Sequence, residues 1–123
     1  MLLNDISGAV IDSAMSVHSE LGPGMLESTY EACLIHELRS RGLAVLNQLI
    51  LPVIYRNTQI DTGYRIDLLV EDKIIIELKA VEKLLPIHEA QLLTYLKLSQ
   101  KKIGLLINFN TLRLKHGIKR MAN

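Results

Sequence analysis

Apolar positions recur at helical spacing in three stretches of this chain, and they alternate or run continuously in four others. The helical spacing predicts helices at residues 5–21, 26–41 and 86–99. The other pattern predicts strands at residues 44–55, 64–70, 74–80 and 102–108, and the tail adds one short further element. The order α-α-β-β-β-α-β predicts an α/β fold, in which helices flank a mixed sheet.

The second and third strands carry Asp67, Glu77 and Lys79 inside apolar runs. An ionised group in the protein interior costs several kcal/mol unless a partner compensates it. Because side chains alternate across a strand, we expect the charges on one face and an apolar face opposite. That apolar face would carry Ile66, Leu68 and Val70 in the first strand and Ile74, Ile76, Leu78 and Ala80 in the second.

The turn between these strands decides whether the two acids meet. A two-residue turn would place Asp67 opposite Ile76 and put the charges on different faces. A three-residue loop, with Val70 opposite Ile74, would place Asp67 opposite Glu77 with Cβ atoms roughly 4.5–5.5 Å apart. Only the second register puts both apolar faces on one core, so we expect it.

Two carboxylates this close repel each other unless a cation lies between them. Oxygen ligands of this kind suit Mg²⁺ or Mn²⁺, and Lys79 reaches the same place. The alternative is an ordinary salt-bridged hairpin in which Lys79 neutralises Asp67. Further polar groups support a site. Glu27 belongs to the stripe of Tyr30, Leu34 and Leu38 on the second helix, so we expect it to point inward. A polar stripe on the third helix consists of His88, Gln91 and Tyr95.

A chain of 123 residues with 49% apolar and 22% charged residues predicts one domain, residues 1–123. No apolar stretch approaches the roughly 20 residues of a membrane span, so we expect no membrane partner. We see no signal peptide, and the single Cys33 fits a reducing cytoplasm as a buried structural thiol. The four histidines lack the paired spacing of a zinc site.

Charge is distributed unevenly along the chain. Residues 1–96 contain 7 Lys and Arg and 13 Asp and Glu, a net charge of −6. The remaining residues have a net charge of +7 and no acid, which suggests an anionic partner, nucleic acid first. A solvated basic face is the alternative. The basic residues are Lys97, Lys101, Lys102, Arg113, Lys115, Lys119 and Arg120.

The segment from Gly24 to Tyr30, GMLESTY, matches the G-x-x-E-x-x-Y motif. Nearly the whole chain resembles the GxxExxY proteins, a family placed in the PD-(D/E)XK nuclease superfamily. The resemblance runs from about residue 6 to residue 118. It implies a restriction-endonuclease-like core in which Glu27 is the glutamate of the first core helix, Asp67 the hairpin aspartate, and Glu77 with Lys79 the E-x-K pair. Gln91 and Tyr95 match a later Q-x-x-x-Y motif. Ile66 stands where the superfamily name has proline.

The resemblance implies hydrolysis of phosphodiester bonds by a water that Mg²⁺ or Mn²⁺ activates. Asp67 and Glu77 would bind the metal, together with the Leu78 carbonyl and with Glu27 directly or through water. Lys79 would orient the water or stabilise the transition state. The positions expected to hold water or phosphate are Gln91, Tyr95 and Arg65.

We expect Lys97, Lys101 and Lys102 to attract nucleic acid, DNA in the first place, without selecting sequence. One Phe and four Tyr offer few stacking platforms for single strands. The main rival is a binding module that uses the same fold without cutting, for instance as a defence or toxin–antitoxin accessory. A homo-oligomer is compatible with the sequence.

Overall fold

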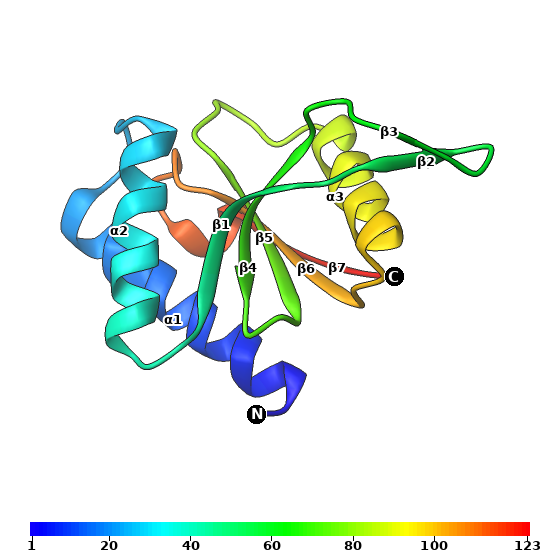
Figure 1. The fold of residues 1–123 in the computed structure, drawn as a ribbon. Helices are drawn as coiled ribbons and strands as arrows, with labels where there is room; N and C mark the ends of the chain where they lie inside the picture. Colours follow the sequence, from blue (N-terminus) through cyan, green and yellow to red (C-terminus); the bar gives the residue numbers. More distant parts are fainter.

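The computed structural model describes all 123 residues, which form one mixed sheet between helices, with a small arm at one end (Figure 1). In chain order the elements are α1 (Leu3–Leu21), α2 (Glu27–Ser40), β1 (Val45–Ile50), β2 (Val53–Tyr55), β3 (Thr58–Ile60), β4 (Arg65–Val70), β5 (Ile74–Lys79), α3 (Pro86–Ser99), β6 (Ile103–Asn108), the 3₁₀ helix η1 (Leu114–Gly117) and β7 (Ile118–Ala122).

The main sheet has the strand order β1-β4-β5-β6-β7. β5 and β6 run parallel, whereas the other neighbouring strands run antiparallel. Parallel neighbours need a long crossover, and α3 supplies it between β5 and β6. The predicted α/β class, a mixed sheet flanked by helices, is confirmed.

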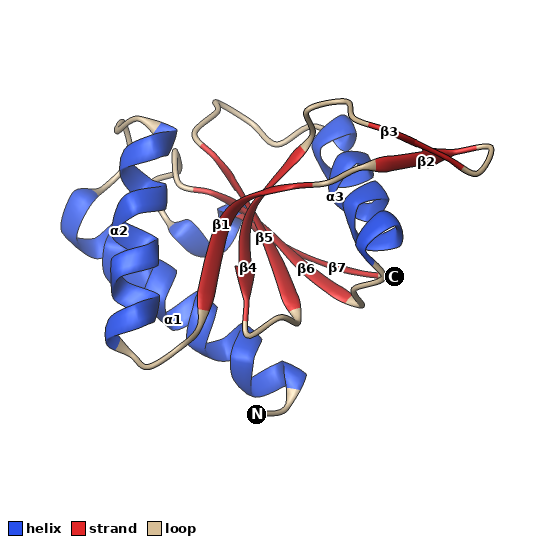
Figure 2. Cartoon of the chain, viewed as in Figure 1, coloured by secondary structure: helices blue, strands red, loops and turns tan.

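The two faces of the sheet are covered unequally. α1 and α2 lie on one face and α3 lies on the other (Figure 2). The core on the α1–α2 side holds 19 buried residues and the core under α3 holds eight, so most of the stabilising apolar burial lies on the side away from α3. α3 nevertheless packs tightly on β6, because a Cβ atom at Gly104 would lie 2.8 Å from Leu92 Cδ1. No helix combines the length and apolar character that crossing a membrane requires.

The predicted strand at residues 44–55 is in fact two strands in two different sheets. Pro52 lies between β1 and β2, and because proline has no N–H group it cannot continue the ladder. Arg56 and Asn57, both with positive φ, then turn the chain into β3. This β2–β3 arm projects beyond the main sheet (Figure 1).

The C-terminal tail forms η1 and then the edge strand β7, which pairs antiparallel with β6. The pattern of residues predicted only one short element here, and it did not predict β3 at all. Both β3 and β7 are short edge strands without a buried residue, so apolar and polar positions do not alternate clearly along them.

Candidate functional site

The β4–β5 hairpin opens where its two acids lie. The two strands pair from Val70–Ile74 to Leu68–Ile76, the register expected for a three-residue loop. Beyond that point carboxylates replace the ladder: the Asp67 N–H donates to Oε1 of Glu77 (3.1 Å), and the Leu78 N–H donates to Oδ2 of Asp67 (2.9 Å). Asp67 and Glu77 therefore lie side by side.

The other side of β4 is also interrupted at Asp67. Pairing with β1 skips Gln48, whose φ of 52° is unusual for a residue other than glycine. The break disturbs the alternation of side chains: Leu68 and Val70 belong to the core under α1 and α2, whereas Ile66 belongs to the core under α3. The prediction that Ile66 shares the face of Leu68 and Val70 is therefore wrong.

β5 keeps the expected alternation throughout. Ile74, Ile76 and Leu78 pack in the core under α1 and α2, and Ala80 lies against the same core. Ile75, on the opposite face, packs under α3. Glu77 and Lys79 follow Ile75 at two-residue steps and therefore project from this face toward the end of the sheet.

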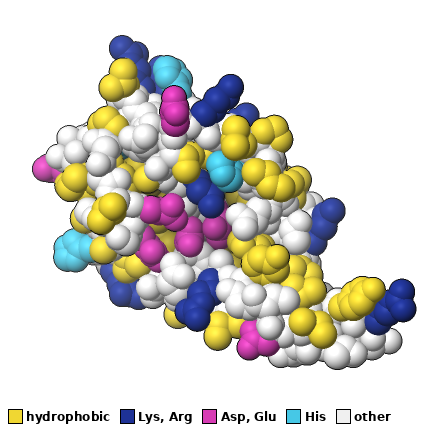
Figure 3. All heavy atoms as spheres, turned by 90° about the horizontal axis from the view of Figure 1, so that it is seen from above, with side chains coloured by type: hydrophobic (Ala, Val, Ile, Leu, Met, Phe, Trp, Pro, Cys, Tyr) yellow, Lys and Arg dark blue, Asp and Glu magenta, His cyan; other side chains and the backbone are white.

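Without a cation, the surroundings of Asp67 and Glu77 disfavour the ionisation of both carboxyl groups at once. Glu77 is only 5% exposed. This burial, reinforced by the negative charge of Asp67, raises the pKa of Glu77 to about 9, and Lys79 only partly opposes the shift. Glu77 is thus protonated at neutral pH, and a bound cation would displace that proton. Acidic side chains gather at the centre of this end of the molecule, with a basic side chain beside them (Figure 3).

Glu27 is the first residue of α2 and reaches the edge of this group. It is exposed, so the prediction that Glu27 points inward with Tyr30 is wrong. The buried apolar stripe of α2 begins one turn later, at Tyr30, and Glu27 lies beyond the end of the core. Partial burial and then the charge of Asp67 raise the pKa of the Glu27 carboxyl, while Lys79 lowers it. The Glu27 carboxyl therefore lies within electrostatic reach of Asp67.

Tyr30 fixes the loop that precedes Glu27. Its buried hydroxyl donates to the Gly22 carbonyl (2.5 Å) and accepts from the Met25 N–H (3.1 Å). Its ring stacks on Phe109 with centroids 4.6 Å apart. The tyrosine of the G-x-x-E-x-x-Y motif is thus a buried anchor, and it positions the start of α2 where the glutamate of the motif stands.

Lys79 is half-buried and forms no ion pair. The only two ion pairs in the molecule are Arg41–Glu37 and Lys101–Asp72. The alternative of a salt bridge between Lys79 and Asp67 is therefore wrong. The Lys79 charge nevertheless acts on the carboxyls of Glu27 and Glu77, which leaves its ammonium close to the acids and unpaired.

The Leu78 carbonyl points toward the open end of the hairpin. The N–H and C=O groups of one strand residue point to the same side, and the Leu78 N–H faces Asp67 on β4. The carbonyl of the next residue, Lys79, instead accepts from Phe109 N–H on the β6 side (2.9 Å). The Leu78 carbonyl oxygen consequently faces the same gap as the two acids.

Tyr95 is the one predicted residue of α3 that the structure links to the acids. It is buried, and this burial, together with the charges of Glu77 and Asp67, raises the pKa of its hydroxyl. Gln91 is half-buried one turn earlier, and its side-chain amide forms no hydrogen bond within the chain. The Arg65 side chain on β4 is exposed and has no polar partner. The roles proposed for Gln91 and Arg65 remain predictions.

The predicted nucleic-acid-binding lysines lie at the opposite end of the sheet. Lys101 binds the turn between β4 and β5 through Asp72, at 2.8 Å to its carbonyl and 3.1 Å to its carboxylate. Lys97 and Lys102 are exposed near the same end of α3. A nucleic acid that touched these lysines and the acids would have to extend along the hairpin, and their role remains a prediction.

Two supporting residues have no clear signal in the sequence. Asn108 is buried at the end of β6: its Nδ2 donates to the Val81 carbonyl (2.9 Å) and its Oδ1 accepts from the Val81 N–H (3.1 Å). It fixes the chain that follows Lys79. Tyr64, just before β4, lies against Tyr95 with ring centroids 6.2 Å apart. A lone Asn at a strand end and a Tyr in a loop are common, and only the fold shows what they touch.

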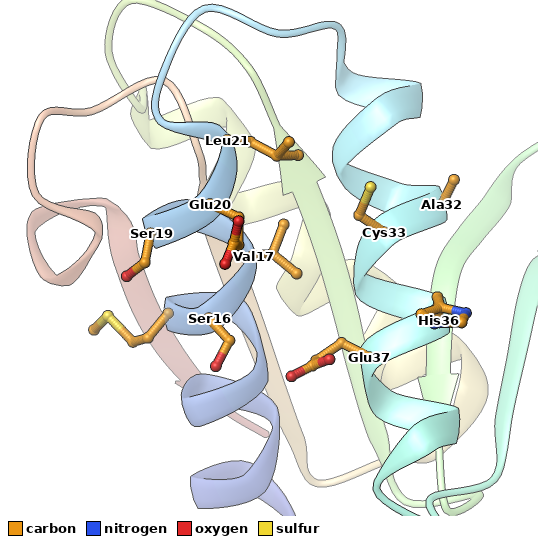
Figure 4. Close-up of a pocket in the computed structure, with 10 residues that line it drawn as sticks. Ser16, Val17, Ser19, Glu20, Leu21, Ala32, Cys33, His36 and Glu37 are labelled. Atoms are coloured by element: carbon orange, nitrogen blue, oxygen red, sulfur yellow. The ribbon is translucent and has the colours of Figure 1, made fainter.

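A hollow of about 790 Å³ lies elsewhere, between α1 and α2 (Figure 4). Cys33 is half-buried and extends from α2 toward α1 in this hollow, where the thiol packs beside the core as a structural group. Its lining contains none of the predicted site residues. Chemistry rather than volume therefore identifies the candidate site as the open end of the hairpin.

No group of three or more His, Cys, Asp and Glu side chains converges closely enough to hold a metal ion by itself. The donor set nonetheless suits a hard cation. Asp67 and Glu77 offer adjacent carboxyl groups and the Leu78 carbonyl faces them. A cation would compensate the negative charge that Glu77 gains when its proton is displaced. Glu27 or water would have to complete the shell.

Comparison with known proteins agrees with this chemistry. A family model described as the PD-(D/E)XK nuclease superfamily matches residues 4–121, nearly the whole chain. No curated protein and no solved structure gave a significant match.

Proposed function

Because the chain belongs to the PD-(D/E)XK nuclease superfamily, we propose that it is a nuclease that hydrolyses phosphodiester bonds of DNA in the presence of Mg²⁺ or Mn²⁺. The observation that carries this proposal is the opening of the β4–β5 hairpin. There Asp67 and Glu77 replace the backbone ladder, with the free ammonium of Lys79 beside them. A structural hairpin has no need of this arrangement.

Asp67 and Glu77 are the residues that would hold the cation, with the Leu78 carbonyl and Glu27, directly or through water, as further ligands. The cation would supply the charge that polarises a water molecule and offsets the negative charge of the phosphate. Glu77 is protonated in the metal-free protein, whereas a cation binds the ionised carboxylate. Cation binding should therefore release a proton from Glu77.

The other side chains would act on the substrate directly. The Lys79 ammonium is a fixed positive charge placed to stabilise the additional negative charge of the transition state. Tyr95 lies beside the acids and would orient a water or a phosphate oxygen, as would Gln91 one turn away. Arg65 is exposed on the same strand as Asp67 and would contact the backbone.

We also place the chain in the GxxExxY group of this superfamily. Two features of the fold support this. Gly24 has φ of 98°, which a residue with a side chain rarely adopts, and Tyr30 holds the loop in which Gly24 lies. The spacing of the motif thus corresponds to one structural unit that presents Glu27.

The rival function is a nucleic-acid- or protein-binding module that does not cut. The exposure of Glu27 and the lack of a complete three-ligand group favour this alternative. Cleavage assays on labelled DNA and RNA with Mn²⁺, and with EDTA as control, separate the two. Nuclease function predicts metal-dependent cutting, with DNA as the preferred substrate, whereas a binding module would retain the labelled strand uncut.

Thermal or denaturant melts test the metal site independently of cutting. Mn²⁺ at about 100 times its Kd should stabilise the wild type by about 2.7 kcal/mol. Asp67→Ala should remove this stabilisation, whereas Asp72→Ala, at the opposite end of the same hairpin, should preserve it. Equal melts with EDTA and Mn²⁺ for wild type would contradict the metal site.

A further inference from the structure

A groove of about 570 Å³ runs between α3 and the chain that leads from the β2–β3 arm into β4. Val53 and Tyr64 form one wall, and Ile87, Gln91 and Tyr95 form the other. The volume is in the range of small-molecule sites, about 300–1,000 Å³, and the walls are mostly apolar with a few polar groups.

Tyr95 relates the groove to the candidate site. The Tyr95 side chain lines the groove, and the charges of Glu77 and Asp67 contribute to the raised pKa of its hydroxyl. A phosphodiester at the acids would therefore have its neighbouring nucleotide next to the groove. We propose that the groove binds an unpaired base of a single-stranded nucleic acid beside the phosphodiester that is cut, an inference that rests on the proposed nuclease function.

Two aromatic rings make the groove suitable for a base. The rings of Tyr64 and Tyr95 are 6.2 Å apart and inclined by 55°, and Tyr64 is 48% exposed and so has a free face. Bases of every type stack on such faces. The Leu51 N–H donates to the Tyr64 carbonyl (2.8 Å), which holds the backbone of Tyr64 in place.

Polar groups at the rim could pair with the edge of the base. The Gln91 amide has no hydrogen-bond partner within the chain, so its donor and acceptor are free. Nδ1 of His88 accepts from the Leu85 N–H (3.0 Å), so the neutral ring carries its proton on Nε2, which is a free donor. Unpaired bases are recognised by such groups on their exposed edges.

The chemistry of the groove favours an unpaired base over a duplex. None of its lining residues is Lys, Arg, Asp or Glu, so the groove itself offers no charge to a phosphate backbone. A base inside a duplex is already stacked on its neighbours and paired along its edge, and it would have to leave the stack to enter. Single-stranded DNA meets no such barrier.

The test compares the binding of a fluorescent single-stranded DNA and of its duplex in EDTA, where metal-dependent cutting does not occur. Tyr64→Ala should weaken single-strand binding about 5- to 140-fold, the range expected for one lost base–aromatic stack. Duplex affinity should change less than twofold. Tyr64→Phe, which keeps the ring, should bind like wild type.

Tyr55→Ala is the matched control, because Tyr55 is similarly exposed (59%) but lies on the arm outside the groove. It should leave both affinities unchanged. Ile87→Glu offers a second perturbation: Ile87 is 67% exposed, so the fold should persist while an added negative charge weakens single-strand binding.

Three results would overturn the inference. Tyr64→Ala and Tyr55→Ala could lose the same amount of affinity for single strands, or Tyr64→Ala could lose as much affinity for duplex as for single strands. The third result is unchanged single-strand binding by Tyr64→Ala. A shift of Tyr64→Ala from dimer to monomer with unchanged DNA binding would assign the groove to a second copy instead. Tyrosine-dependent binding without any Mn²⁺-dependent cleavage would overturn only the nuclease proposal, and cleavage with no effect of Tyr64→Ala on single strands would overturn only the groove.

Discussion

The two ends of the β4–β5 hairpin use the same two strands in different ways. At the turn end, Val70 pairs with Ile74 and the flanking side chains are buried and apolar on both faces. At the open end, Asp67 and Glu77 separate the strands, and their carboxylates accept the backbone N–H groups that the ladder no longer satisfies.

This difference shows how a small domain tolerates acids in a central strand. Buried backbone N–H groups need partners, and a carboxylate can replace the missing carbonyl. The replacement has an electrostatic cost, because burial and the charge of Asp67 disfavour the ionised form of Glu77. A regular hairpin would be more stable, so the open end is best explained by a requirement for a cation and a substrate.

The largest expected effect separates function from stability at the open end. Lys79→Ala should lower the cleavage rate about 10²- to 10³-fold, the usual effect of removing one group that stabilises a developing charge. Stability should change little, because Lys79 forms no ion pair. A denaturant melt and a Mn²⁺-dependent cleavage time course on the same variant measure both quantities.

Lys83→Ala, an exposed lysine in the loop after β5, is the control and should cut like wild type. If Lys79 were instead needed to neutralise the buried acids, its removal would cost roughly 3–5 kcal/mol of stability without a specific effect on hydrolysis. A Lys79→Ala protein that melts far below wild type and still cuts at the wild-type rate excludes the catalytic role.

The next effect concerns pH. Native Glu77 keeps its proton up to a pKa of about 9, whereas an unfolded glutamate loses it near 4.5. Between these values the native state binds more protons, so the stability of the metal-free protein should fall as pH rises, by up to about 1.4 kcal/mol per pH unit. Urea melts from pH 5 to pH 9 in EDTA measure the slope.

Glu77→Gln should remove most of this slope and be more stable than wild type at pH 9, since glutamine does not ionise. Glu82→Gln changes an exposed acid five residues further along and should keep the wild-type slope. A flat stability profile for wild type over this interval would show that burial and the charge of Asp67 do not raise the pKa of Glu77.

A smaller effect is expected where the open end is supported from α2. Tyr30→Phe removes the hydroxyl that binds the Gly22 carbonyl and the Met25 N–H but keeps the stack on Phe109. The loss should be about 1 kcal/mol, the usual net value of such hydrogen bonds. Denaturant melts give the change, and Tyr55→Phe, at an exposed position, is the control.

Cleavage by Tyr30→Phe tests whether Glu27 matters to the site. If the loop places Glu27 for metal binding, a higher Mn²⁺ concentration should be needed for half-maximal activity. An unchanged metal requirement, together with the expected loss of stability, would leave Tyr30 a purely structural anchor.

The smallest effect is expected at the turn end. Lys101→Ala removes the ion pair with Asp72, whose side chain is 84% exposed. Exposed ion pairs contribute only about 0–1 kcal/mol to stability. Cleavage of a saturating substrate should stay within twofold of wild type. A large loss of cleavage rate at saturation would show that the turn end takes part in catalysis and would remove the contrast between the two ends.

Much of the site could be predicted from local sequence. The register of the hairpin follows from the spacing of Val70 and Ile74 and from the need to bury one apolar face, so the proximity of Asp67 and Glu77 was predictable. The α/β class and the three helices follow from periodicity in the same way, whereas the division of residues 44–55 into β1 and β2 at Pro52 was not predicted.

Tertiary structure decided the rest. The sequence determined which residues share a strand or a helix face, because that depends on local geometry. Only the packed fold determined that Glu27 overhangs the core, that Tyr64 meets Tyr95, and that Lys101 binds the far end of the hairpin. These relations depend on where helices dock and where the sheet opens, and a one-dimensional pattern does not specify those distances.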